Sequence, residues 1–96
     1  MTNIIVELDP KDTEANAPAI EALGGNATVV PSERFDGVLV VQVMAAINGV
    51  TLPLLAKLIS DAIRANRYVV VKKKGLEVKG LSADDAIKVL RELKDD

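Results

Sequence analysis

The chain contains no cysteine, no histidine and no tryptophan. Without cysteine and histidine, the usual zinc sites, thiol nucleophiles and imidazole general bases are excluded, and no disulfide can form. Aromatic residues are also scarce, since Phe35 and Tyr68 make up the entire 2%. Single-stranded nucleic acids and sugars are commonly held on aromatic faces. Recognition of these ligands is therefore disfavoured.

Aliphatic residues are abundant instead. The chain is 49% hydrophobic and 27% charged, which gives it enough apolar mass to fold and too little net charge to remain disordered. Its 96 residues suffice for one hydrophobic core but not for two. We therefore expect a single domain over residues 1–96, with a core of valine, isoleucine, leucine and alanine.

The net charge of −2 conceals an uneven distribution along the chain. Residues 1–56 carry two basic and seven acidic residues, residues 57–79 carry seven basic and two acidic, and residues 80–96 carry three basic and five acidic. Such asymmetry indicates either a solvated basic face or docking between oppositely charged surfaces. The candidate contacts for docking are a basic hairpin and an acidic surface: Arg67, Lys72, Lys73, Lys74 and Lys79 against Glu7, Asp9 and Asp12.

The first third of the chain predicts a strand, a helix and a second strand. Residues 4–8 alternate as a half-buried strand does. A short helix follows, with Asn16 as its cap and Pro18 in its first turn, and Gly24-Gly25 ends it. Ala27 to Val30 form a brief strand, which Pro31-Ser32 closes.

The middle of the chain is ambiguous. Residues 37–56 carry no charge and approach the length that spans a bilayer, but Asn48-Gly49 and Pro53 fit a turn better than a membrane span. Apolar residues in 38–47 recur at helical spacing and predict a helix, whereas their valine content favours a buried strand. Thr51 is the expected cap of a following helix, whose apolar face comprises Leu52, Leu55, Ile59, Ala62 and Ile63.

The last third predicts a hairpin and a helix. Residues 67–73 form the clearest strand, Lys74-Gly75 the turn, and residues 76–79 the returning strand. Ser82 caps the final helix, with Asp85 at the capping-box position and acidic residues in its first turn. The apolar stripe of this helix consists of Ala83, Ala86, Ile87, Leu90 and Leu93.

The expected order is β-α-β-α-α-β-β-α, which implies an α/β (α+β) two-layer domain with a small sheet covered by helices. If residues 38–47 form a strand instead, the order becomes the ferredoxin-like β-α-β-β-α-β unit, followed by the hairpin strand and the C-terminal helix.

Candidate chemistry is sparse. Asp84 and Asp85 are adjacent in a helix and point about 100° apart, which is poor geometry for sharing a ligand, and their place in a first helical turn explains them structurally. Gly24-Gly25 lacks the strand-to-helix context of a dinucleotide site. The chain contains no Ser-x-x-Lys spacing that could activate a serine. Lys72–Lys74 could contact phosphates, but the acidic domain disfavours nucleic acid. We expect no catalytic residue, no cofactor and no metal site.

From residue 38 to residue 93 the sequence resembles a bacterial family, the effector-associated constant component domains. The resemblance lies in the segments Val38–Val41, Asn48-Gly49, Leu54–Ile59 and Ala65–Val71, and in Gly80-Leu81-Ser82 ahead of Leu90. It implies a non-catalytic adaptor of bacterial conflict or signalling systems, which couples an effector such as a protease or nucleotide-cleaving domain to a sensor. The family offers no catalytic residues to carry over.

The sequence therefore predicts a protein-interaction or adaptor domain whose partner is another protein or a second copy of the chain. The alternative is a regulatory domain of ferredoxin-like type that binds a small ligand or an anion. The first residues have no basic start and no sustained apolar run, so we expect a cytoplasmic location. A membrane partner is not expected.

Overall fold

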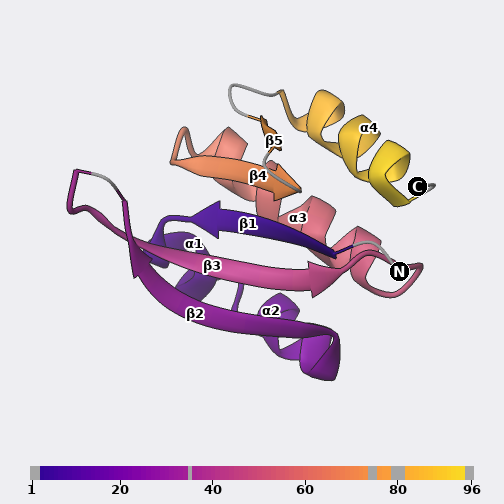
Figure 1. Cartoon of the computed structure of the whole chain (residues 1–96), viewed down its shortest axis with the longest axis horizontal. Helices are drawn as coiled ribbons and strands as arrows, with labels where there is room; N and C mark the ends of the chain where they lie inside the picture. The colour runs from indigo at the N-terminus through magenta and orange to yellow at the C-terminus, as the bar shows by residue number, and fades with distance from the viewer. Residues whose placement is uncertain (1–2, 35, 74–75, 79–81, 95–96) are drawn as a thin grey trace.

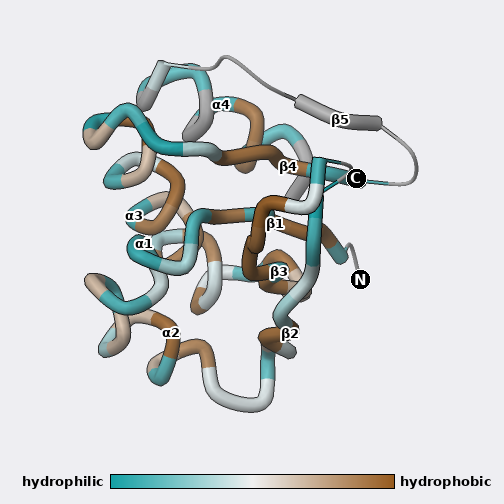
Figure 2. Tube along the Cα trace, turned by 90° about the vertical axis from the view of Figure 1, so that its left-hand side faces the viewer, coloured by the Kyte–Doolittle hydropathy of each residue, from teal (hydrophilic) through white to brown (hydrophobic). Residues whose placement is uncertain are grey.

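The computed structural model describes residues 3–34, 36–73, 76–78 and 82–94. A five-stranded antiparallel sheet has the strand order β2-β3-β1-β4-β5. The helices of the described chain lie together on one face of this sheet (Figure 1), and Figure 2 shows the two layers edge-on. The strands are β1 (Asn3–Leu8), β2 (Ala27–Glu33), β3 (Leu39–Ala46), β4 (Val69–Lys73) and β5 (Leu76–Val78). The helical elements are α1 (Pro10–Ala15), α2 (Ala17–Leu23), the 3-10 turn η1 (Gly24–Asn26), α3 (Thr51–Arg64) and α4 (Ala83–Lys94).

The two-layer α+β prediction is confirmed, and the order of elements is that of the ferredoxin-like alternative. The helix predicted for residues 38–47 is wrong, because this segment is the strand β3. β3 lies between β1 and β2, and side chains on both of its faces are buried, including Val40 and Val43. A strand with apolar residues on both faces shows an almost continuous apolar run, which periodicity cannot distinguish from a buried helix.

The edge strand β2 is longer than expected. Pro31 does not close it, since β2 continues to Glu33 and Pro31 pairs with Val41 of β3. β2 has a strand neighbour on one side only. Proline lacks a backbone N–H, and an edge strand tolerates that loss.

Two short helices replace the single one predicted after β1. Asp9 caps α1 by accepting a hydrogen bond from the backbone N–H of Lys11 (2.8 Å), and Pro10 occupies the first turn. Asn16 marks the boundary between α1 and α2, and Pro18 lies in the first turn of α2 as predicted. The sequence interpretation missed α1, although Asp-Pro is a helix start as well as a strand end.

The helix α3 is held at both ends by specific hydrogen bonds. Asn48, rather than Thr51, caps its start, because Asn48 Oδ1 accepts from the N–H groups of Val50 and Thr51. The buried Thr51 hydroxyl instead donates to the carbonyl of Ala46 at the end of β3 (2.6 Å). At the other end Asn66 adopts a left-handed conformation (φ 56°), and the N–H of Arg67 bonds to the carbonyl of Ala62. This is a Schellman ending with asparagine in the place of glycine.

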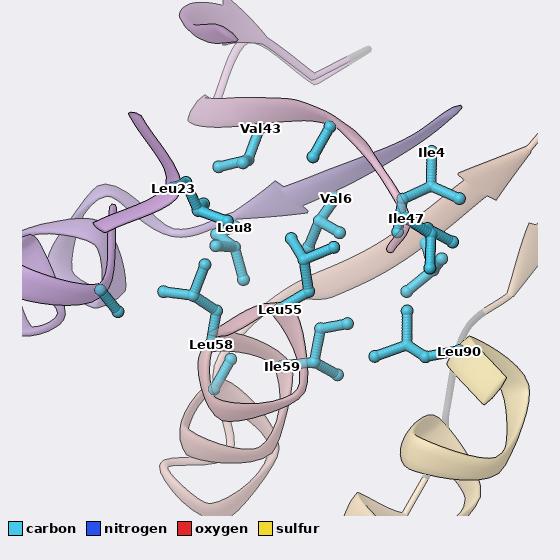
Figure 3. Close-up of a cluster of buried hydrophobic side chains, with 14 residues drawn as sticks. Ile4, Val6, Leu8, Leu23, Val43, Ile47, Leu55, Leu58, Ile59 and Leu90 are labelled. Atoms are coloured by element: carbon cyan, nitrogen blue, oxygen red, sulfur yellow. The ribbon is translucent and has the colours of Figure 1, made fainter. Parts of the chain in front are cut away.

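The hydrophobic core lies between the sheet and the helices (Figure 3). The apolar face predicted for α3 is confirmed: Leu55, Ile59 and Ala62 are buried, while Leu52 and Ile63 are partly buried against the core. Each fully buried aliphatic side chain contributes about 1.5–3 kcal/mol relative to exposure. The other main members are Ile4, Val6, Leu8, Leu23, Val43, Ile47, Leu58 and Leu90.

The C-terminal helix packs beside α3, and its Leu90 is buried in the core. The predicted cap is confirmed, since the N–H of Asp85 bonds to Ser82 Oγ (3.2 Å). The side chains of Ala83, Ala86, Ile87 and Leu93 lie outside the described residues, as do Lys74-Gly75 and Lys79. No helix within the described ranges is long and apolar enough to cross a membrane.

Candidate interaction surfaces

The face of the sheet opposite the helices carries a polar cluster centred on Glu7. Alternation along β1 directs Ile4, Val6 and Leu8 into the core and Glu7 to the other face. Glu7 Oε1 accepts a hydrogen bond from the Tyr68 hydroxyl, and Oε2 accepts from Gln42 Nε2 and Lys72 Nζ, each at 2.8 Å. We call these four residues the Glu7 cluster. These side-chain hydrogen bonds connect the three neighbouring strands β3, β1 and β4, in addition to the backbone hydrogen bonds between them.

The hydrogen bonds of the cluster determine its protonation. Burial raises the pKa of Glu7, but the hydrogen bonds from Lys72, Gln42 and Tyr68 outweigh it, so the pKa lies below its ordinary value of 4.5. Burial and the neighbouring Glu7 carboxylate raise the pKa of Tyr68 above 10.0. A carboxylate that is ionised at neutral pH and surrounded by three donors is a poor proton acceptor. The arrangement favours a structural role for Glu7.

The connection between β2 and β3 folds back toward the Glu7 cluster. The Arg34 guanidinium stands 4.4 Å from the centre of the Tyr68 ring, within the range of a cation–π contact. Arg34 also pairs with Asp36 at 2.6 Å. The backbone N–H of Val38 and the Arg34 charge together lower the pKa of Asp36. The positive charges on this part of the open face therefore have acidic partners within the chain.

A second ion pair joins α1 to the segment that follows α3. Arg67 Nη1 donates to Asp12 Oδ1 at 2.8 Å. The Asp12 side chain is only 2% exposed, whereas that of Arg67 is 38% exposed. Asp12 Oδ2 is buried without a hydrogen-bond partner among the described residues. The pair thus fixes the start of β4 against α1, and its carboxylate is enclosed by protein.

The residues that the sequence suggested for docking lie in different environments, and some of them are buried in ion pairs within the chain. Glu7 and Asp12 are buried and bound to Lys72 and Arg67, so they offer no accessible acidic surface. Asp9 caps α1. Lys73 lies half-buried on β4, and Lys74 and Lys79 lie outside the described residues.

A different surface, which the sequence interpretation missed, lies on β2, on β3 and on Val38 just before β3. Large aliphatic side chains are exposed there on both faces of the sheet. Val29 is in register with the core residue Val43 and lies on the helix side, whereas Val30 is in register with Gln42 and lies on the open face. We call the exposed set the β2–β3 apolar strip: Val29 (43% exposed), Val30 (37%), Val38 (50%), Leu39 (63%) and Met44 (40%).

The strip was missed because residues 38–47 were interpreted as helix. The signal that could have found it is the stretch from Ala22 to Ser32, which carries no charge and contains the β-branched run Thr28-Val29-Val30. A proline beside such a β-branched segment places it at the edge of a sheet, where proline is tolerated, and the lack of charge leaves its aliphatic side chains without the usual protection of an edge.

No protein-family model, no curated protein and no solved structure matches this chain. Among the residues the structure describes, no group of three or more acidic side chains is placed to hold a metal ion. The surfaces just described are therefore the basis for assigning a function.

Proposed function

We propose that this chain is a non-catalytic protein-interaction domain that docks a protein through the β2–β3 apolar strip. Together with the resemblance of residues 38–93 to effector-associated constant component domains, this suggests an adaptor in a bacterial cytoplasmic conflict or signalling system. The single observation that carries the proposal is the concentration of exposed aliphatic side chains on one edge of the sheet.

Exposed aliphatic residues are common singly, but a contiguous group marks an interaction surface. Among the residues whose side chains the structure describes, six large hydrophobic residues are exposed; five of them belong to the strip, and the sixth, Val50, precedes α3. Register places Val30 beside Gln42 and Thr28 beside Met44, so Val30 and Met44 are diagonal neighbours on the open face. The strip thus has residues of both strands on each face of the sheet, with Val30 and Met44 on the open face and Val29 and Leu39 on the helix side.

The placement of the charged groups also favours docking through the apolar strip, because two of the cations that could dock a partner are already paired. Lys72 and Arg67, which the sequence suggested as docking residues, are bound to Glu7 and Asp12 of the same chain. A partner that drew either cation away from its carboxylate would leave a buried charge without its counterion, which is costly. Docking through the apolar strip requires no such exchange.

Site-specific photo-cross-linking in the cells that make the protein tests this proposal. A photoreactive amino acid is placed at Leu39 in one variant and at Val50 in a control, since the two positions are similarly exposed (63% and 61%). We expect a discrete protein adduct from Leu39 and none from Val50. Adducts of equal yield at both positions, or none at Leu39, would contradict the proposal. Mass spectrometry of the adduct then tests the adaptor assignment, because the expected partners are an effector, a sensor or a second copy of the chain.

A further inference from the structure

The partner of the apolar strip can be inferred from the way the strip is divided between the two faces of the sheet. Val29 and Val30 are consecutive residues of the edge strand β2, and they point to opposite faces. A partner that covered one face would leave the other valine in water. A strand added alongside β2 would contact both, because its own side chains alternate in the same way.

The backbone of β2 is suited to such an addition. β2 stands at the end of the sheet order, and β3 occupies one of its two sides. An edge strand presents unpaired N–H and C=O groups to a further strand. Natural edges are commonly protected by lysine or proline, but β2 contains no lysine, and its proline, Pro31, lies near its end. The segment Ala27–Val30 is left unprotected.

We infer that the strand which pairs with β2 is β2 of a second copy of this chain, in antiparallel orientation about a two-fold axis near Val29. This inference rests on the proposed function and names its partner. The resulting dimer would have one continuous sheet across both copies. Such a contact uses the same surface on each copy, as two-fold dimers do.

The charges of the edge favour self-pairing in this orientation. No residue from Ala22 to Ser32 is charged, so two copies of β2 bring no like charges together at the centre of the contact. Glu33 is the acidic residue at one end of β2. In an antiparallel pair centred between Thr28 and Val30, the two copies of Glu33 lie at opposite ends, at least about 20 Å apart along the strands. That exceeds the screening length of about 8 Å at physiological salt, whereas a parallel pair would place them side by side.

The position of Pro31 is compatible with the same axis. In an antiparallel pair centred on Val29, each Pro31 stands opposite Ala27 of the other copy. The missing N–H groups then weaken the two ends of the new ladder and leave its centre intact. Valine opposite valine at the centre is a favourable cross-strand pair.

Single-cysteine cross-linking measures this arrangement directly, because the natural chain has no cysteine. Cysteine is placed singly at Thr28, Val29 and Val30, and at Val50 as the exposed control. Directly opposed residues of an antiparallel pair have Cα atoms about 4.5–5.5 Å apart, within the range for a disulfide. One residue away from the axis, identical positions are already offset by about 7 Å along the strand. We therefore expect dimer formation to peak sharply at one of the three positions and to be low at Val50.

Light scattering of the cysteine-free protein gives the equilibrium test. We expect a concentration-dependent dimer whose dissociation constant rises at least about tenfold in Val30→Lys, since the two lysines would then lie diagonally across the axis on the same face of the sheet, each opposite Thr28 of the other copy. Val50→Lys is the matched control and should leave the dissociation constant unchanged. Circular dichroism verifies that each variant folds, and Val29→Lys is a second test if Val30→Lys does not fold.

The inference is overturned by a protein that stays monomeric at high concentration, by a disulfide yield no higher at residues 28–30 than at Val50, or by a dimer that the lysine variants do not weaken. If the chain is monomeric but Leu39 still forms a photo-adduct with a different protein, self-pairing fails and the proposed function stands. If Leu39 forms no adduct either, both fail.

Discussion

The β1–β4 side of the sheet and the β2–β3 side differ in their surface groups: charged residues are paired on the first, and aliphatic residues are exposed on the second. On the β1–β4 side, charges far apart in the sequence meet: Lys72 binds Glu7, and Arg67 binds Asp12, at 2.8 Å each. On the β2–β3 side, Val30, Leu39 and Met44 remain exposed. The contrast teaches that these two pairs of opposite charges hold distant segments of one chain together, while the aliphatic side chains of the β2–β3 side are left in contact with solvent.

The largest stability effect that tests this contrast concerns the Arg67–Asp12 pair. Arg67→Met leaves the enclosed Asp12 carboxylate without its cation. We expect a loss of about 2 kcal/mol in the free energy of unfolding, below the roughly 3–5 kcal/mol of fully buried pairs because water reaches Arg67. Lys57→Met, which breaks the surface pair with Asp61, should cost no more than about 0.5 kcal/mol. Urea unfolding of both variants measures the difference, and equal losses would contradict an internal role for Arg67.

The next prediction compares the effect on stability of a glutamate-to-glutamine substitution on β1 and on the edge strand β2. Glu7→Gln replaces a carboxylate that accepts three hydrogen bonds by an amide whose NH₂ group faces other donors. We expect a loss of about 1.5–2 kcal/mol in unfolding free energy. The matched change on the edge strand, Glu33→Gln, should lie within about 0.5 kcal/mol of the natural protein. If both variants were equally stable, the Glu7 cluster would contribute nothing to the fold.

The pH dependence of stability sharpens the same comparison. The folded pKa of Glu7 lies below its ordinary value of 4.5, so folding favours the ionised form. Its stabilisation is complete above the unfolded pKa and is lost as the pH falls through the folded pKa. We expect the stability gap between the natural protein and Glu7→Gln to be constant near neutral pH and to shrink below about pH 4.5. A gap that widens on acidification would mean that the pKa of Glu7 is raised.

The smallest effect concerns the residue that positions Arg67. Asn66 has φ 56°, a conformation that glycine adopts without strain. Asn66→Gly should therefore raise the unfolding free energy by about 0.5 kcal/mol. Ala65→Gly, at φ −80°, should lower it by a similar amount, because glycine there adds only freedom to the unfolded chain. Thermal unfolding of both variants checks the opposite signs, and a destabilised Asn66→Gly would contradict the Schellman ending.

Local sequence patterns predicted most of the helices and strands, because the residues that determine each element lie close together in the sequence. The alternation of residues 4–8, the apolar face of α3 and the Ser82 cap of α4 all follow from neighbours in the sequence. Residues 38–47 could not be assigned in this way. Their state depends on pairing with β1 and β2 on either side, and a run apolar on both faces fits a helix as well as a strand.

The polar clusters could not be predicted from local sequence patterns either, because their members come from distant segments of the chain. The uneven charge was visible in the sequence, and it suggested docking between molecules. The sheet instead brings Glu7 and Lys72 together across 65 residues of sequence, which only strand order and register determine. Opposite charges in separate segments therefore indicated a contact correctly, but not whether it lies within one chain or between two.

Sedimentation equilibrium at low and at high salt, over a wide range of protein concentration, tests the central claim most directly. Exposed charge pairs weaken as salt screens them, whereas burial of apolar surface does not. The account predicts a dimer whose dissociation constant is the same or lower at high salt, because the apolar edge forms the contact. A dimer that dissociates at high salt, or a monomer at every concentration, would contradict it.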